Sequence, residues 1–560
     1  MKQDREHPAG QPDSLHGRFE QQALRWPQRL ALSYRGQHLS YQQLNERADE
    51  RASQLRAAGV QAGDLVALML PRGLDLVVQV LAVLKAGAGY VPIDPNYPQE
   101  RVDWMLESSQ PVRLLTHRHL ANRLWEAGVP EALHNRIQWI DVDEPHSAAP
   151  LSPARGRPTD AGQTDHSALA VAYIIFTSGS TGKPKGVMVG HHQVMYLLDA
   201  VIPRLHCDQT DVWTLFHSLA FDFSVWELWG ALTTGGRLCI VPQDVTWSAD
   251  SFAALLRAEQ VTVLNQTPSA FYALTQTESQ LLAQGDNPLP LRSVIFGGEA
   301  LNMHQIKRWW SLYAPGQPRL INMYGITETT VHVTWLELTQ TLADTDGSPI
   351  GEAIPGLEVH LLNSALAPVA EGEPGEIHVG GRQLALGYLG RPDLTASRFI
   401  ADPIHPGQRL YRSGDLAVRR AGQLFYLGRA DRQLKIRGFR IEPAEVEAAI
   451  ESHPAVQRCA VLAQPAKAGH TSDGLLAFLV ATAGVDPLPE ATDLRRHLAE
   501  RLPVHCLPAE FLFLEKLPLT VNGKLDQAVL LTHWRAQQPP DNAQQRRLEL
   551  LRAKLAETVR

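Results

Sequence analysis

Helical and extended hydrophobic patterns alternate over roughly the first 400 residues of the chain. Ser40 can cap a helix whose apolar positions recur at spacings of three and four over Leu44–Leu55, and Gly59 can end it. The short apolar run Val66–Met69 then predicts a buried strand, and Leu74–Leu84 predicts the next helix. This alternation predicts an α/β fold in which crossover helices cover largely parallel sheets.

Later segments of the chain break this alternation. Residues 143–166 are rich in Pro, Gly, Ser and Ala, which predicts an exposed loop between two subdomains. Short strand-like runs separated by glycine-rich turns predict a β-rich subdomain over Gly356–Leu427, and the charged stretch Gly428–Arg437 predicts a hinge. After the hinge we expect helices at Pro443–Ser452 and Ala491–Arg501, strands at Ala460–Ala463 and Leu475–Val480, and a final loop.

These patterns divide the chain into three predicted parts. Residues 1–430 form a large core of parallel-sheet α/β subdomains together with the β-rich subdomain. Residues 431–534 form a small α+β domain, which is long enough to fold around a core of its own. Residues 535–560 form a polar tail in which Leu548–Val559 has a helical pattern.

The composition narrows the class of protein. Hydrophobic residues make up 44% of the chain and charged residues 20%, as in globular proteins with large cores. The 52 Lys and Arg residues against 59 Asp and Glu residues give a formal charge of −7, which argues against binding to nucleic acid or to an anionic membrane. The four cysteines form no CxxC pair and the polar N-terminus resembles no signal peptide, so we expect a soluble, cytoplasmic protein.

One segment predicts a phosphate-binding loop. An apolar strand ending at Phe176 leads into the loop residues Thr177, Ser178, Gly179, Ser180, Thr181, Gly182 and Lys183. Glycines let backbone N–H groups approach an anion, hydroxyl groups add donors, and lysine supplies positive charge. The loop is not a Walker A motif, because Pro184 stands where that motif has serine or threonine. A flexible solvated loop is the alternative interpretation, and the adjacent apolar strand argues against it.

Several segments, taken in order, resemble the core motifs of the amino-acid adenylation domains of nonribosomal peptide synthetases, which belong to the adenylate-forming superfamily. They are the phosphate loop and the segments Leu84–Asp94, Asn322–Glu328, Tyr411–Leu416, Gly428–Gly438 and Asn522–Asp526. The resemblance extends from about Leu39 to Asp526 and implies a large core with a small, mobile C-terminal domain. Ile326 departs from the pattern, because the family usually has proline there; we expect this to change loop stiffness more than chemistry.

The resemblance implies roles in making an acyl-adenylate from ATP, a reaction that brings two anions together and therefore needs cations and oriented donors. Thr177–Lys183 would hold the β- and γ-phosphates, Thr327 the α-phosphate, and Glu328 a Mg²⁺ ion. Lys524 would bridge the substrate carboxylate and the phosphate, and Asp431 would be the pivot of the small domain. The other nucleotide-binding positions are Gly298, Glu299, Ala300, Asn322, Tyr324, Gly325, Asp415 and Arg429. Taken singly, each has an ordinary structural alternative, such as a core tyrosine or a solvated surface lysine.

The resemblance also implies an amino-acid pocket. Its lining positions are Asp222, Phe223, Trp226, Asn265, Ile295, Gly297, Met323, Val331 and His332. Asp222 would pair with an α-ammonium group, while Trp226 and Met323 would exclude large substrates. Asn265 and His332 are polar in an otherwise apolar lining and favour a substrate hydroxyl, because buried polar groups need partners. The set resembles the family's threonine pocket, so we predict L-threonine, with serine as the main weaker substrate. A backbone-bonded Asn265 and a satisfied core His332 are the structural alternatives.

The signatures of neighbouring assembly-line domains are absent from the sequence. There is no Leu-Gly-Gly-x-Ser carrier motif and no Gly-x-Ser-x-Gly nucleophile elbow. His191-His192 begins like a condensation motif, but the expected Asp-Gly does not follow, and we interpret the pair as two surface histidines. We therefore expect a stand-alone enzyme that loads the phosphopantetheine thiol of a carrier protein in trans. The need for an MbtH-like activator stays open.

Two other functions compete with this prediction. An acyl- or aryl-CoA ligase of the same superfamily would transfer to coenzyme A; Asp222 and the amino-acid motifs argue against it. A nucleotide-binding ATPase or regulator would make ADP, whereas the ligase makes AMP and pyrophosphate. A catalytically inactive partner protein is disfavoured because Glu328, Asp415 and Lys524 are all present.

Overall fold

The computed structural model describes residues 14–125, 138–141, 171–179, 183–314, 316–343, 345, 347–465, 474–482, 484–485, 487–518 and 525–538. Within these residues the large N-terminal part contains a sheet of 14 strands and a sheet of seven. The 14-stranded sheet has the spatial order β16 (Leu357–Leu362), β17 (Gly375–Gly381), β20 (Arg409–Arg420), β21 (Gln423–Arg429), β15 (Ser348–Ala353), β14 (Thr334–Glu337), β13 (Arg319–Asn322), β12 (Ser293–Phe296), β11 (Val263–Gln266), β9 (Val212–Leu215), β10 (Arg237–Ile240), β1 (Leu30–Tyr34) and β2 (Gln37–Ser40), with β19 (Phe399–Ala401) paired to β20. The other sheet has the order β18 (Gly387–Tyr388), β8 (Lys185–Gly190), β7 (Val171–Thr177), β4 (Gly89–Pro92), β3 (Leu65–Met69), β5 (Arg113–Thr116) and β6 (Gln138–Asp141).

The α/β class predicted from the sequence is confirmed. Strands β1, β10, β9, β11, β12 and β13 pair in parallel, as do β7, β4, β3, β5 and β6. From β13 onward the pairs are antiparallel, which gives the predicted β-rich region at one end of the larger sheet. Parallel strands are covered by crossover helices on both faces, so the apolar core lies between helices and sheets.

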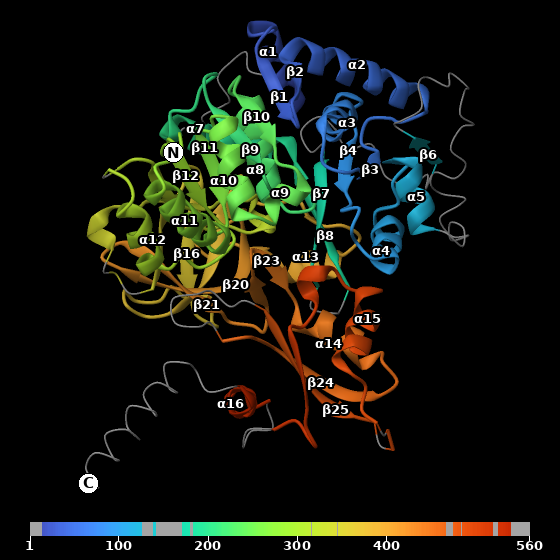
Figure 1. Cartoon of the computed structure of the whole chain (residues 1–560), viewed down its shortest axis with the longest axis vertical. Helices are drawn as coiled ribbons and strands as arrows, with labels where there is room; N and C mark the ends of the chain where they lie inside the picture. The colour runs from blue at the N-terminus through green and yellow to red at the C-terminus, as the bar shows by residue number, and fades with distance from the viewer. Residues whose placement is uncertain are drawn as a thin grey trace.

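Helices form the layers around the two sheets (Figure 1). Those that share one hydrophobic core with strands of both sheets are α1 (Leu15–Arg25), α2 (Tyr41–Ala57), α3 (Leu74–Lys85), α7 (His191–Leu205) and α8 (Phe223–Leu232). A second core joins β11, β12 and β13 to α10 (Ala249–Ala258), α11 (Pro268–Ala283) and α12 (Met303–Trp310), and a third joins the seven-stranded sheet to α4 (Gln99–Ser109) and α5 (Arg118–Leu124). Two short helices, α9 (Gln243–Thr246) and α13 (Pro392–Arg398), complete this part.

The start of α2 follows the predicted capping chemistry. The hydroxyl of Ser40 accepts the Gln43 N–H at 3.2 Å, and the Gln43 side chain accepts the Ser40 N–H at 2.9 Å. This reciprocal pair satisfies two backbone donors that the first helical turn leaves free. None of the described helices has both the length and the apolar character that a bilayer crossing requires.

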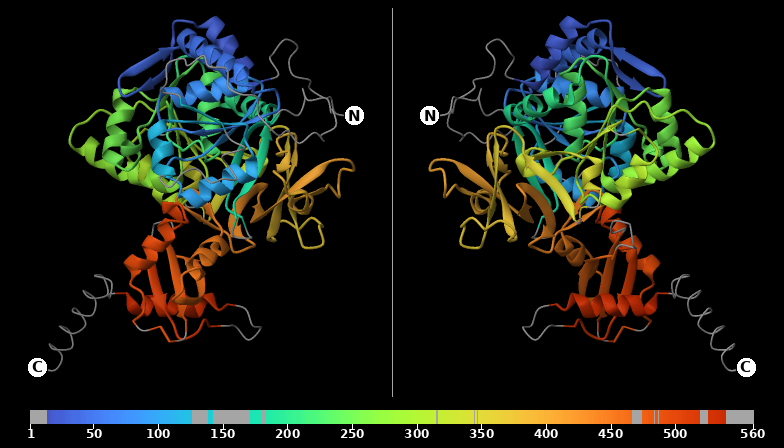
Figure 2. Two further views of the ribbon diagram at one scale, coloured as in Figure 1. Left: turned by 90° about the vertical axis from the view of Figure 1, so that its right-hand side faces the viewer. Right: turned by 90° about the vertical axis from the view of Figure 1, so that its left-hand side faces the viewer.

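The small C-terminal domain projects from the large part (Figure 2). Its sheet consists of β24 (Val456–Ala463), β25 (Leu475–Ala481) and β26 (Glu510–Phe513). Helices α14 (Pro443–Glu451) and α15 (Ala491–Ala499) share one core with this sheet, and α16 (Gln527–Gln537) shares a second core with it through Leu530 and Trp534. The expected small α+β domain is therefore present, with two separate cores.

Several details of the sequence prediction are wrong. The stretch Gly428–Arg437 is not turn-forming throughout, because it contains strand β22 (Leu434–Ile436), which pairs with β23 (Phe439–Ile441) as a hairpin; its role as a hinge stays a prediction. The predicted final loop contains β26 and α16, and α16 runs through the predicted boundary between residues 534 and 535. His191 is buried rather than at the surface, and its Nδ1 accepts the Leu15 N–H at 3.3 Å. The division at residue 430 stays a prediction, and the segments 143–166 and 548–559 lie outside the described residues.

Candidate functional site

The candidate site lies at the carboxyl ends of the parallel strands β11, β12 and β13. The motif residues Gly297–Ala300 directly follow β12, and Met323–Glu328 directly follow β13. Asp222 stands one residue before α8, and the hairpin β22–β23 covers the site from the other side. Ligands of open α/β sheets bind at this edge, because the loops that follow the strands are free there to vary.

A pocket at this edge brings together many of the predicted amino-acid-binding residues. Its lining residues are Phe221, Asp222, Phe223, Gly297, Gly298, Gly325, Ile326, Thr327, Val331, His332, Lys435, Gly438 and Arg440. Burial raises the pKa of the Asp222 carboxyl to about 6, against a hydrogen bond with Thr327 that lowers it. Asp222 is 6% exposed, so a cation in the pocket would meet a carboxylate with little competing water.

His332 is buried among aromatic rings and has unpartnered polar atoms. Its ring centroid lies 5.2 Å from that of Phe223 and 5.5 Å from that of Trp226, in edge-to-face geometry. Both ring nitrogens are buried without a hydrogen-bond partner, and burial lowers the pKa of His332 to about 3, so the imidazole is neutral at pH 7. An unpaired buried polar group is costly, which makes this side chain receptive to a polar ligand.

Only one of the two polar atoms of the Asn265 side chain has a hydrogen-bond partner. Its Oδ1 accepts the indole N–H of Trp226 at 2.8 Å, while its Nδ2 is buried without a partner. Trp226, Ile295 and Asn265 are fully buried and are not among the residues that line the pocket; Trp226 packs against the His332 ring, and Asn265 lies behind Trp226. Met323, which the sequence prediction placed in this pocket, lines the neighbouring pocket.

That neighbouring pocket contains six of the predicted nucleotide-binding residues, all from the loops that follow β12 and β13 or from the end of β13. It is lined by Gly298, Glu299, Ala300, Asn322, Met323, Tyr324, Gly325, Ser348, Ile350, Tyr426 and Lys435. The Glu299 carboxylate accepts the N–H of Ser269 at 2.9 Å and its hydroxyl at 3.0 Å, and Asn322 donates to the carbonyl of Pro349 at 2.7 Å. These two side chains therefore hold the loops in place, which leaves the backbone of Gly298–Ala300 to face the pocket.

Asp415 is fully buried beside this pocket and already has several donors. It accepts hydrogen bonds from the hydroxyls of Tyr324 at 2.7 Å and Tyr426 at 3.2 Å, and from Nη1 of Arg429 at 3.1 Å. Burial alone would raise the pKa of Asp415, but Lys435 and Arg429 outweigh it and lower the pKa. Asp415 is therefore ionised in this arrangement.

Arg429 joins Asp415 to the predicted hinge. While its Nη1 reaches Asp415, its Nε and Nη2 donate to the carboxylate of Asp431 at 2.8 and 2.6 Å. The sequence prediction named all three residues but not this connection. Paired N–H groups of a guanidinium fix the direction of a carboxylate, so the start of the small domain is oriented by the nucleotide side of the site.

Glu328, the predicted Mg²⁺ ligand, is fully buried in a cluster of donors. It accepts from the hydroxyl of Tyr388 at 2.8 Å and from Nη1 of Arg440 at 2.9 Å, and Nζ of Lys185 lies 3.2 Å away. Burial would raise the pKa of Glu328, but Arg440 and Lys185 lower it well below its usual range. Burial also lowers the pKa of Lys185, to about 8. The prediction missed Lys185, Tyr388 and Arg440; the second lysine of the phosphate loop was the available signal.

The hairpin β22–β23 occupies the space over both pockets. Its two-residue turn, Arg437–Gly438, has φ values of +50° and +81°, and a Cβ atom on Gly438 would lie 2.5 Å from the side chain of Thr267. Nζ of Lys435 lies 5.5 Å from the ring centroid of Tyr324, and the Ser178 hydroxyl donates to the carbonyl of Arg440 at 2.7 Å. The small domain thus supplies positive charge to the site.

Two predicted functional segments lie at the limits of the described residues. Lys183 is described, with Nζ 4.1 Å from the ring centroid of Trp104, whereas Ser180, Thr181 and Gly182 are outside the described residues. Lys524 is outside them as well. Its neighbour Leu525 packs against the α16 core of the small domain.

Comparison with known proteins places this site in a family. The AMP-binding enzyme model matches residues 19–389, and the AMP-binding enzyme C-terminal domain model matches residues 445–524. The chain belongs to the AMP-binding enzyme family and is an adenylation domain of that superfamily.

The chain is similar to curated synthases. The chain is 47% identical over 522 residues to the dimodular nonribosomal peptide synthase of Bacillus subtilis (strain 168), covering 92% of this chain and 21% of that protein. It is 39% identical over 520 residues to syringomycin synthase SyrB1 of Pseudomonas syringae pv. syringae, covering 92% of this chain and 81% of that protein. The chain thus spans about a fifth of the first relative and most of the second.

Among solved structures, NpsA-ThdA, an artificially fused adenylation-PCP di-domain NRPS from Klebsiella oxytoca, matches with a TM-score of 0.74 and 26% identity, covering 90% of this chain and 94% of that one. Holo-PA1221, an NRPS protein containing adenylation and PCP domains, matches with the same TM-score and identity, covering 93% and 84%. The arrangement of a large sheet domain and a small C-terminal domain is therefore that of adenylation domains.

Proposed function

We propose that the chain activates L-threonine with ATP to give threonyl-AMP and pyrophosphate, and then transfers the threonyl group to the phosphopantetheine thiol of a carrier protein in trans. One observation supports this most directly: Asp222, a buried carboxylate, and His332, whose ring nitrogens have no hydrogen-bond partner, line the same pocket. Asp222 would pair with the α-ammonium group, and His332 and Asn265 would read the side-chain hydroxyl.

The unpartnered atoms favour a hydroxyl-bearing substrate over an apolar one. A neutral imidazole offers one donor and one acceptor, and Nδ2 of Asn265 offers further donors. A hydroxyl group can donate one hydrogen bond and accept two, so it can satisfy either side chain. Valine has nearly the same shape as threonine but would leave these atoms unpaired at the full desolvation cost.

The nucleotide side fits ATP with Mg²⁺. Glu328 is a buried carboxylate of the kind that Mg²⁺ binds together with phosphate oxygens, and the ion would neutralise charge on the phosphates. Arg440 and Lys185 balance Glu328 in the present arrangement. Tyr324 and the backbone of Gly298–Ala300 would bind adenine, and Asp415 would accept the ribose hydroxyls after exchanging some of its present donors.

The position of the small domain suggests which half-reaction this arrangement serves. Lys435 and Arg440 of the small domain line the amino-acid pocket, and Lys435 also lines the nucleotide pocket. We infer that this is the thiolation arrangement, in which the adenylate is already made and the pantetheine thiol enters. Adenylation would require the small domain to turn about Asp431 and bring Lys524 to the substrate carboxylate.

Product analysis with a panel of amino acids tests the proposal. Each of the common amino acids is tested for its ability to drive exchange of labelled pyrophosphate into ATP, and threonine is expected to give the highest rate. Formation of AMP and pyrophosphate rather than ADP would separate the ligase from an ATPase. Transfer to free coenzyme A in place of a holo-carrier domain would indicate a CoA ligase and contradict the proposal.

A further inference from the structure

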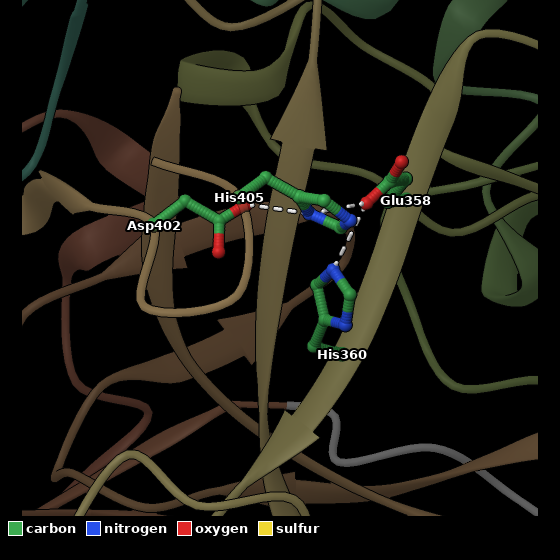
Figure 3. Close-up of side chains that lie close together, drawn as sticks. All are labelled: Glu358, His360, Asp402 and His405. Atoms are coloured by element: carbon green, nitrogen blue, oxygen red, sulfur yellow. Dashed lines mark hydrogen bonds and ion pairs between the residues drawn. The ribbon is translucent and has the colours of Figure 1, made fainter. Parts of the chain in front are cut away.

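Two histidines and two carboxylates converge in the β-rich region (Figure 3). Glu358 and His360 are two residues apart on β16, so both side chains point to the same face of the sheet. Asp402 and His405 follow β19. One candidate ligand atom from each of the four side chains lies within 4.8 Å of the others. None of the four belongs to the proposed nucleotide or amino-acid site.

The polar contacts inside the cluster converge on Glu358 and on His405. Oε2 of Glu358 lies 3.3 Å from Nε2 of His360 and 3.3 Å from Nδ1 of His405. The same Nδ1 lies 3.1 Å from Oδ2 of Asp402. A single proton on Nδ1 cannot point at both carboxylates, since a hydrogen bond weakens steeply away from linearity. One cation placed among the four atoms would satisfy all of them at once.

The cluster is partly preorganised and open on one side. The Asp402 side chain is 1% exposed, and its Oδ1 accepts the Ile404 N–H at 2.7 Å, which leaves Oδ2 directed at the histidine. The side chains of Glu358 and His405 are 49% and 42% exposed, so an ion can enter from solvent. A fixed buried ligand combined with exposed ligands gives both a defined geometry and an entry path.

We propose that Glu358, His360, Asp402 and His405 form a binding site for a divalent transition-metal cation, with Zn²⁺ as the best match. Tetrahedral Zn²⁺ binds imidazole nitrogen and carboxylate oxygen at about 2.0–2.2 Å, so neighbouring ligand atoms lie about 3.4 Å apart. Three of the six spacings between the ligand atoms, at 3.1 to 3.3 Å, already approach that value, and all six lie within 4.8 Å. Mg²⁺ prefers octahedral oxygen ligands and should bind poorly here. The ion would tie the segment after β19 to strand β16.

Calorimetric titration tests the site. The full chain, freed of metal with a chelator that is then removed, is titrated with ZnCl₂ and separately with MgCl₂ in the absence of ATP. We expect one equivalent of Zn²⁺ to bind, and the double variant His360→Ala/His405→Ala to lose affinity by more than the roughly 10–100-fold that removing a supporting group costs. The matched control is His453→Ala/His497→Ala, whose rings also lie close, with centroids 4.9 Å apart, and which should bind Zn²⁺ like the wild type.

Two further readouts separate metal binding from a folding defect. Zn²⁺ should raise the melting temperature of the wild type and of the histidine control but not of the double variant, while all three melt alike in EDTA. Glu358→Gln keeps the shape of the side chain and should weaken binding in the same direction. X-ray absorption at the zinc edge should show nitrogen and oxygen ligands. Equal affinity of wild type and double variant, the absence of one-to-one binding, or sulfur ligands from a cysteine would each overturn the proposal.

Discussion

The amino-acid pocket and the nucleotide side of the candidate site adjoin each other but are prepared for ligands in opposite ways. In and behind the amino-acid pocket, both nitrogens of His332 and the amide nitrogen of Asn265 are buried without partners. On the nucleotide side, Glu328 and Asp415 are surrounded by donors, and each has an arginine among them. The first region has vacant hydrogen-bonding capacity, whereas the second has its charge balanced already.

This difference indicates two separate tasks. A pocket with unpaired neutral groups selects its ligand, because only a substrate with the right polar atoms removes the desolvation cost. A charge-balanced region is suited to controlling the order of the two half-reactions instead, because one of its cations, Arg440, comes from the small domain. If the small domain turns, Glu328 loses that partner and needs another cation. Substrate specificity would then be tested by changing residues of the pocket, and the order of adenylation and transfer by changing residues of the small domain.

The largest expected effect concerns the pocket. Threonine should be activated best, serine roughly 10–200-fold less well because it lacks one methyl group, and valine up to about 10⁴-fold less well because it leaves polar groups unpaired. His332→Leu should narrow the gap between threonine and valine, measured as kcat/KM in pyrophosphate exchange. Equal activation of valine and threonine by the wild type would show that His332 and Asn265 do not read a hydroxyl.

The second expected effect concerns the small domain. Lys524→Ala should slow adenylation by roughly 10²–10³, the size expected when one donor to a developing charge is lost. The melting temperature should be unchanged, and Lys516→Ala, which removes an exposed lysine from the same domain, serves as the control. Near-normal adenylation by Lys524→Ala would remove the lysine from the proposed mechanism and leave the small domain with a role in transfer alone.

The fold class and most helices and strands of the large part could be predicted from the sequence, because these depend on local patterns of residues. The helix after Ser40 has both a capping pair and a regular apolar face, and it forms where the pattern places it. The hairpin β22–β23 was missed because its strands are three residues each and Arg437-Gly438 is a weaker turn signal than Asn-Gly. Helix α16 was missed because its apolar residues pack against a sheet formed by distant segments.

In the candidate site, too, the residues of local motifs could be predicted, whereas their distant partners could not. Motif order pointed to Asp222, Glu328 and Asp415; in the structure Asp222 lines the amino-acid pocket, Asp415 is bonded to Tyr324 of the nucleotide pocket, and Glu328 is held by Arg440. Their partners could not be predicted in the same way, because Tyr388 and Arg440 come from strands far along the chain and meet Glu328 only through tertiary packing. Pairing between distant residues is set by topology, which a pattern along the chain does not specify.

A third, smaller effect follows from the raised pKa of Asp222. With a pKa of about 6, its carboxyl is protonated at lower pH and cannot pair with an ammonium group. We expect kcat/KM for threonine to fall about tenfold for each pH unit below this pKa. Asp222→Asn should lose this dependence along with most activity.

The same carboxyl should affect folding stability in a predictable direction. Its pKa is raised by burial, so the native state is destabilised as pH rises from the unfolded value near 4 through about 6. Asp222→Asn should therefore melt at a higher temperature than the wild type above pH 6, and the two melting temperatures should converge at low pH.

For the activity prediction, a wild-type activity profile that is flat between pH 5 and 7 would argue against an ionised Asp222 in substrate binding.

The smallest expected change in adenylation comes from the proposed pivot. Proline at position 431 fixes φ and removes a backbone donor, and it also removes the carboxylate that Arg429 holds at 2.6 and 2.8 Å. Asp431→Asn is the matched control, since it weakens the same contact but leaves the backbone free to turn. If the small domain pivots here, Asp431→Pro should slow transfer of the threonyl group to a holo-carrier domain in a single turnover, leave adenylate formation largely intact, and be much worse than Asp431→Asn. Equal loss of both half-reactions would instead indicate a folding defect, and similar behaviour of the two variants would assign the effect to the Arg429 contact rather than to backbone rotation.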